Sequence, residues 1–108
     1  MVTEMNLKQM FLGKVLGETT TTVYTVSSSV QSAVVKELVI FNNGTTSANV
    51  EVAINGINLV SQDIDPKDSL FGDKTWYLVM NANDTLTITT EKEVNVLLSG
   101  VETVAASV

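Results

Sequence analysis

The chain consists of short runs in which apolar residues alternate with polar ones, and turn residues separate these runs about every ten positions. The alternation is clearest where Ala48, Val50, Val52 and Ile54 are interleaved with Asn49, Glu51, Ala53 and Asn55. A period of two places the two sets on opposite faces of a strand, with the apolar set toward the core and the polar set toward solvent. The sequence therefore predicts an all-β fold, an antiparallel, jelly-roll-like β-sandwich of about seven or eight strands in one pair of layers.

The segments with this strand signal follow one another along most of the chain. They are residues 9–16, 21–26, 33–42, 47–55, 57–61, 74–80, 85–90 and 93–101. Residues 62–73 contain the only proline and four of the twelve acidic residues. Because proline cannot donate to a ladder and acidic residues are depleted in strands, we expect this segment to be a long surface connection.

The segment 33–42 is apolar on both faces. Under strict alternation the two sets are Val34, Leu38 and Ile40 on one face and Val35, Val39 and Phe41 on the other. A strand of this kind is typically covered on both sides. One of the two faces lines the core of the domain. The other, with Val35, Val39 and Phe41, is therefore a candidate surface for self-association into a homo-oligomer.

The residues after this segment, "NNGTTS" at 42–47, favour a hairpin. Asn43 and Gly44 take positive φ at little cost, which tight hairpin turns require. We therefore expect the strand at 47–55 to return antiparallel beside the strand at 33–42.

A length of 108 residues suits one domain with one core. We predict a sandwich domain over residues 12–103 and a tail over residues 104–108. Residues 1–11 are predicted to be an N-terminal arm, for which two alternatives stay open. One is a loose segment, and the other is a short helix lined by Met1, Met5, Leu7 and Met10.

The charge of the chain limits its partners. Twelve acidic residues face six lysines, no arginine and no histidine, giving a net charge of −6. Nucleic-acid binding draws its affinity from basic residues that neutralise phosphates, so we predict no nucleic-acid partner. No apolar run approaches the roughly 20 residues of a membrane span, so no membrane insertion is expected. The N-terminus does not resemble a secretory signal, which predicts folding in a cytoplasm.

The inventory of reactive side chains is short. Without histidine or cysteine, the most common general base, the thiol nucleophile and the soft ligands of a zinc site are missing. Asp63, Asp65 and Asp68 are a candidate calcium loop, but Lys67 stands where an EF-hand needs an oxygen ligand. A solvated acidic loop is the favoured interpretation. We predict no enzyme activity, no catalytic, cofactor-binding or metal-binding residue, and no cofactor.

The aromatic residues of the chain suggest saccharide binding as an alternative function. Tyr24, Trp76 and Tyr77 have flat faces on which sugar rings stack. Trp76 alternates with Leu78 and Met80 in its predicted strand, which favours a place in the core. Saccharide binding is therefore not the favoured interpretation.

Four segments together resemble small virion proteins of tailed bacteriophages that infect Gram-positive hosts. They are "LGETTTTVYTV", "SAVVKELVIFNNGTTSANVEVAIN", "YLVMNANDTLTITT" and "VNVLLSGVE", within residues 12–102. The resemblance is to small tail-region proteins of Bacillus siphophages, whose sandwich is similar to the shoulder domain of lactococcal phage receptor-binding proteins.

This resemblance implies a structural or assembly role in a phage particle, in the tail or baseplate. The implied partners are other phage structural proteins, and the implied location is the virion, with the host cytoplasm during assembly. The resemblance transfers no saccharide site, because the sugar-binding head domain of those receptor-binding proteins has no counterpart in these segments. A carbohydrate-binding or host-adhesion module remains the alternative function.

Overall fold

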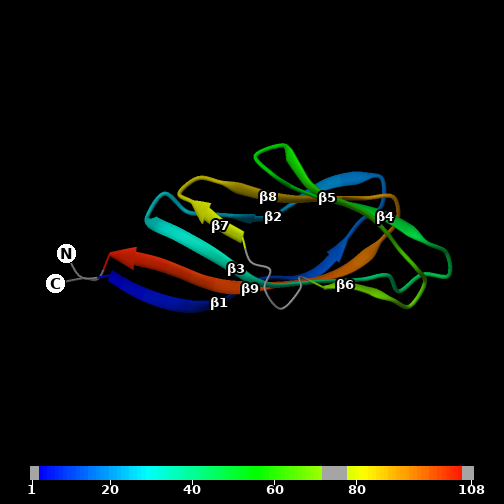
Figure 1. The fold of residues 1–108 in the computed structure, drawn as a ribbon, viewed down its shortest axis with the longest axis horizontal. Helices are drawn as coiled ribbons and strands as arrows, with labels where there is room; N and C mark the ends of the chain where they lie inside the picture. The colour runs from blue at the N-terminus through cyan, green and yellow to red at the C-terminus, as the bar shows by residue number, and fades with distance from the viewer. Residues whose placement is uncertain (1–2, 72–77, 106–108) are drawn as a thin grey trace.

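The computed structural model of the chain describes residues 3–71 and 78–105. In these residues nine strands form two antiparallel sheets that face each other across the core (Figure 1). The first sheet contains β1 (Thr3–Val15), β3 (Val30–Phe41), β6 (Ser69–Phe71), β7 (Leu78–Asn81) and β9 (Val94–Ala105). The second sheet contains β2 (Thr19–Thr25), β4 (Ala48–Ile54), β5 (Ile57–Ile64) and β8 (Thr85–Thr90). The predicted all-β sandwich is confirmed, with nine described strands where seven or eight were expected.

The order of the strands is that of a jelly roll. The first sheet has the order β1-β9-β3-β6, with β7 also paired to β3, and the second has the order β2-β8-β4-β5. The pairs β1–β9, β2–β8, β3–β6 and β4–β5 are those of one long hairpin whose tip is the β4–β5 turn. When this hairpin rolls up, β9 comes to lie beside β3 and β8 beside β4, which gives two sheets from one ribbon.

The core lies between the inner faces of the two sheets. Its largest fully buried side chains include Ile40, Met80, Leu86, Ile88 and Leu98. Alternate residues of β8 and β9 are buried, as a period of two requires: Leu86 and Ile88 in β8, and Val94, Val96 and Leu98 in β9. Burial of these branched side chains supplies the main stabilisation of the fold.

A β-bulge in β3 corrects the predicted assignment of its two faces. Lys36 is an extra residue between Val35, which pairs with Gly100, and Glu37, which pairs with Ser99. Such an insertion shifts the alternation by one position, so Val35 and Leu38 both point into the core. The prediction that Val34 shares a face with Leu38 and Ile40 is therefore wrong.

The predicted hairpin at residues 42–47 is also wrong. β3 and β4 lie in different sheets, and this segment carries the chain from one sheet to the other. The buried side chain of Asn42 holds the crossing. Its Nδ2 donates to the carbonyl oxygens of Thr46 at 2.8 Å and Ile64 at 2.9 Å, and its Oδ1 accepts from the Gly44 amide at 2.9 Å.

A tight two-residue hairpin lies instead at Asn55–Gly56, between β4 and β5. Ile54 pairs with Ile57 across this turn, and Asn55 and Gly56 have φ values of 52° and 80°. Two successive positive φ values are the requirement of a type I′ turn, for which Asn-Gly is the favoured sequence. The same dipeptide occurs at residues 43–44, where the hairpin was expected, so the dipeptide alone does not locate the turn.

Two further segments differ from expectation. Residues 3–11 are extended and belong to β1, so the short-helix alternative for the N-terminal arm is wrong for them, and β1 continues without a break past residue 11. The described part of the segment 62–73, up to residue 71, is not one long connection, and residues 72–73 lie outside the described residues. β5 continues to Ile64, and β6 pairs with β3 after a tight turn at residues 65–68, in which Lys67 has a φ of 61°.

Candidate functional site

The outer face of the first sheet carries apolar side chains that are aligned across several strands. Directly paired residues of an antiparallel sheet point to the same face. One row of such partners crosses β1, β9, β3 and β7, and consists of Leu7, Val101, Val34 and Val79. A second row crosses β1, β9 and β3, and consists of Leu12, Leu97 and Val39. None of these side chains belongs to the core cluster, and all except Val101, which its neighbours cover to 5% exposure, are half-buried or exposed.

The ends of these rows are strongly exposed. Leu7 is 88% exposed, Leu12 is 69% exposed and Val79 is 64% exposed. Met5 precedes Leu7 by two positions on β1 and shares its face. Isolated apolar residues are common on protein surfaces, whereas aligned rows that cross several strands form a contiguous patch. We name these two rows, together with Met5 and Phe41, the apolar face.

A polar band separates the two rows. Gln9, Ser99 and Glu37 are successive partners across β1, β9 and β3. The bulge residue Lys36 lies beside Glu37 and is exposed. The band lies in a shallow depression of about 320 Å³, lined by Leu7, Lys8, Gln9, Lys36, Glu37, Ser99 and Gly100.

Gly100 explains why the sheet is irregular at this point. A Cβ on Gly100 would lie 2.0 Å from the carbonyl oxygen of Val34 on the neighbouring strand. The two strands that flank β9 both carry a bulge next to the partner of Ser99. In β1, Met10 lies between the partners of Ser99 and Leu98, and in β3, Lys36 lies between the partners of Gly100 and Ser99. A backbone approach this close leaves room only for glycine, and the bulges beside it re-aim the adjacent side chains.

The outer face of the second sheet is polar. Thr20, Thr89, Glu51 and Ser61 are successive partners across its four strands. The hydroxyls of Thr20 and Thr89 are 2.7 Å apart and share a hydrogen bond. A shallow depression of about 420 Å³ on this side is lined by Glu18, Asn49, Glu51, Thr89, Thr90 and Glu91. This face is typical of a solvated surface.

Three polar side chains close one end of the core. The Tyr24 hydroxyl, from β2, donates to Glu102 Oε2 on β9, and Lys8 Nζ on β1 lies 3.2 Å from the same oxygen. Burial, the hydrogen bond to Glu102 and its negative charge together raise the pKa of Tyr24 above its ordinary range. Tyr24 is 6% exposed and its hydroxyl is engaged, so its ring does not offer the flat surface that we considered for sugar stacking.

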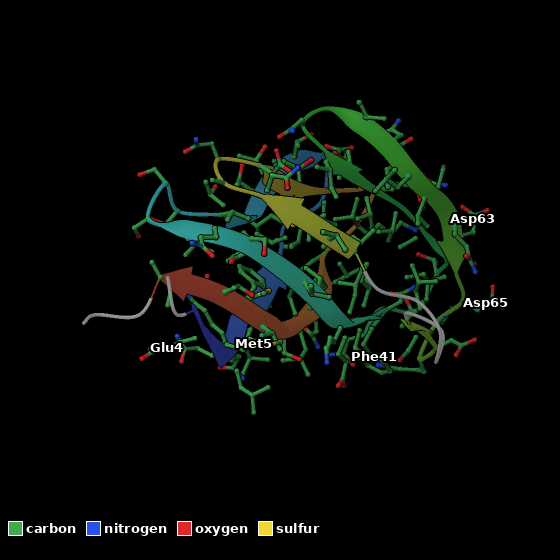
Figure 2. All side chains as sticks on the ribbon, turned by 60° about the vertical axis from the view of Figure 1, so that its left-hand side comes forward. Glu4, Met5, Phe41, Asp63 and Asp65 are labelled. Atoms are coloured by element: carbon green, nitrogen blue, oxygen red, sulfur yellow. The ribbon has the colours of Figure 1, made fainter. Side chains whose placement is uncertain are left out.

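The acidic residues of the candidate calcium loop do not converge. Asp63 Oδ1 accepts from Asn49 Nδ2 at 2.9 Å, Asp65 Oδ1 accepts from the Ser47 hydroxyl, and an Asp68 carboxylate oxygen accepts from the Ser69 amide. Figure 2 shows Asp63 and Asp65 at the end of the molecule away from Glu4 and Met5. In residues 3–71 and 78–105, no three histidine, cysteine or acidic side chains gather as a metal site.

The aromatic residues on which the saccharide alternative depends are only partly described. Trp76 and Tyr77 lie outside the described residues, so the predicted place of Trp76 in the core stays a prediction. Phe41 lies on the outer side of the first sheet and is half-buried (Figure 2). Within the described part of the chain, no helix has the length and apolar character to cross a membrane.

Comparisons with known proteins give no family. No protein-family model matches the chain, and no curated protein matches it. Two solved structures of infectious bursal disease virus are similar in backbone. One, of the viral particle, has a TM-score of 0.47 and 13% identity over 94% of this chain. The other, of the Gx strain, has a TM-score of 0.46 and 10% identity over 95% of this chain. The chain spans only 31% and 33% of those two chains, and likeness of this degree does not establish a family.

Proposed function

We propose that the chain is a non-enzymatic structural protein of a bacteriophage particle, assembled in its tail or baseplate with other phage structural proteins. The apolar face carries this proposal. Soluble monomers rarely expose a contiguous apolar patch that crosses several strands, and such patches typically mark protein contacts. The resemblance of four sequence segments to tail-region virion proteins supplies the phage origin.

The build of the sandwich supports a structural role. Its strands are long, with β1, β3 and β9 covering 13, 12 and 12 residues, and most connections between strands are short. Among the described residues, the buried Tyr24 hydroxyl is engaged in a structural bond to Glu102. A rigid block with one apolar side is well suited to permanent assembly.

A saccharide-binding module remains the alternative, and the described residues contain no feature that favours it. Sugar recognition on a sheet needs exposed aromatic rings beside hydrogen-bonding groups. The exposed large apolar residues in the described part of the chain are aliphatic or methionine side chains.

Immunogold labelling of purified phage particles tests the proposal. An antibody raised against this chain is expected to label the tail or its tip, and particles from a phage lacking the gene are the matched control. Label on the capsid would retain a virion role and refute the tail assignment. Particles without label, together with protein found only in the infected-cell lysate, would refute the virion role.

A further inference from the structure

We propose that the apolar face is the docking site for a second copy of this chain, packed face to face about a two-fold axis. This dimer follows from the pattern of side chains on the face. It deepens the assembly role proposed above, but it does not depend on a phage origin and is tested with the purified protein.

The face has the same pattern on each of its three long strands, namely an apolar residue, a polar position and a second apolar residue. The sets are Leu7, Gln9 and Leu12 on β1, Leu97, Ser99 and Val101 on β9, and Val34, Lys36–Glu37 and Val39 on β3. The polar band therefore runs midway between the two apolar rows.

A two-fold axis that lies in the interface along the polar band makes this pattern self-complementary. It places each apolar row against the other row of the second copy, so that the exposed Leu7 meets Leu12 of the second copy and Leu12 meets its Leu7. In an isologous interface every contact occurs twice in this way. Sheet faces pack about 10 Å apart, which apolar side chains of this size fill.

The charges in the band are complementary under the same axis. Lys36 and Glu37 are neighbours that both project from the bulge of β3 toward this side of the sheet. The rotation places Lys36 opposite Glu37 of the second copy, and Glu37 opposite Lys36. The bulge therefore supplies two opposite charges at the centre of the face, where a regular strand would place only one residue.

The distribution of charge also favours the outer face of the first sheet over that of the second sheet as the dimer interface. The chain carries a net charge of −6. In the described strands of the first sheet, the charged residues on the outer side are Lys14, Lys36 and Glu37. The outer side of the second sheet carries Glu51, with Glu18 and Glu91 beside it. Two copies therefore approach each other through their apolar faces with the least repulsion.

The area of the face is sufficient for a specific dimer. Four strands at about 4.8 Å spacing give a width of roughly 19 Å, and eight residue steps along β9 give roughly 27 Å. The product is about 500 Å² per copy, or about 1,000 Å² for the pair, which reaches the lower bound for a biological interface. We therefore expect a reversible, concentration-dependent dimer.

Sedimentation equilibrium of the purified chain, from micromolar to millimolar concentration, tests the dimer. The unmodified chain is expected to dimerise, and Leu7→Glu and Leu12→Glu are each expected to weaken association at least about tenfold. Both positions are largely exposed in the single chain, so these variants should keep the circular-dichroism spectrum of the sandwich. Ile57→Glu is the matched control, because Ile57 is 68% exposed on β5 of the second sheet and should not affect association.

A charge exchange tests the two-fold axis itself. Lys36→Glu alone and Glu37→Lys alone place like charges opposite each other and are expected to weaken the dimer roughly tenfold. The double variant with both substitutions restores opposite pairs and is expected to restore association. Failure of the double variant to recover, while each single variant weakens the dimer, would overturn the proposed axis.

Three results would overturn the docking site. One is a monomer over the whole concentration range. Another is a dimer that Ile57→Glu weakens as much as Leu7→Glu does. The third is a dimer in which the β1 amides that point away from β9 become protected from hydrogen exchange, because that protection would indicate pairing through the free edge of β1.

Discussion

Gly100 and Val34 approach so closely that a Cβ on Gly100 would lie 2.0 Å from the Val34 carbonyl oxygen. The obstruction is backbone, which cannot move aside as the end of a flexible side chain can. This contact lies under the polar band and fixes how β9 and β3 pair where both neighbouring bulges occur. Gly100 therefore affects both the stability of the first sheet and the arrangement of side chains in the polar band.

Gly100→Ala is expected to destabilise the protein by about 1–3 kcal/mol or more, because the new methyl group forces β9 away from β3. Chemical denaturation measures the change in the free energy of unfolding. Gly13→Ala is the matched control on the neighbouring strand, since its Cβ would meet only the Phe11 ring at 3.5 Å. Equal effects of the two substitutions would contradict the proposed strain.

Asn42→Ala is expected to lower the free energy of unfolding by about 2–4 kcal/mol, because it removes three hydrogen bonds and leaves the buried carbonyl oxygen of Ile64 without its partner. Asn43→Ala, one residue later at an exposed position, should change stability by only about 0.5 kcal/mol. Thermal or urea unfolding of both variants measures the contrast. A mild effect at Asn42 would show that its side chain does not hold the crossing between the sheets.

Tyr24→Phe is expected to cost about 1–2 kcal/mol at neutral pH, through loss of the hydrogen bond to Glu102. The pKa of Tyr24 is raised in the folded protein above its ordinary value of 10.0, so its contribution is complete below pH 10.0 and declines as the pH rises beyond that value. Urea unfolding across alkaline pH should therefore show the advantage of the unmodified chain over Tyr24→Phe shrinking. An advantage independent of pH would refute the assignment.

Asp84 has the opposite dependence on pH. Its carboxylate accepts from Asn55 Nδ2 at 2.9 Å and from the Asn81 amide at 2.8 Å, and these bonds lower its pKa below the ordinary value of 3.8. A lowered pKa contributes stability above pH 3.8 that is lost as the pH falls through the folded value. The unmodified chain should exceed Asp84→Asn in stability at neutral pH, and the difference should diminish in acid. NMR titration of the Asp84 carboxyl carbon gives the pKa directly, and a midpoint at or above 3.8 would contradict this account.

The alternation of residues 48–54 predicted a strand with one dry face, and the recurring strand segments, including 85–90 and 93–101, were sufficient to predict an all-β sandwich. These features are local, because a period of two fixes the face of each side chain wherever the strand is regular. The predicted position of the hairpin was wrong, because Asn-Gly occurs both at residues 43–44 and at Asn55–Gly56, and only the second forms the tight turn. The absence of histidine and cysteine likewise restricted the chemistry before any fold was known.

The sequence by itself determined that the chain forms strands with one buried face. It also showed that the segment 33–42 has apolar residues on both faces, which is more than a single core requires. Only the tertiary structure decided which strands are neighbours, because pairing in a rolled hairpin joins residues as distant as Leu7 and Val101. It also decided that Val34 and Val39 share the outward face, since the extra residue Lys36 shifts the alternation of β3 where this strand pairs with Gly100 and Ser99. Bulges and strand neighbours are set by contacts between distant segments, and local periodicity carries no information about them.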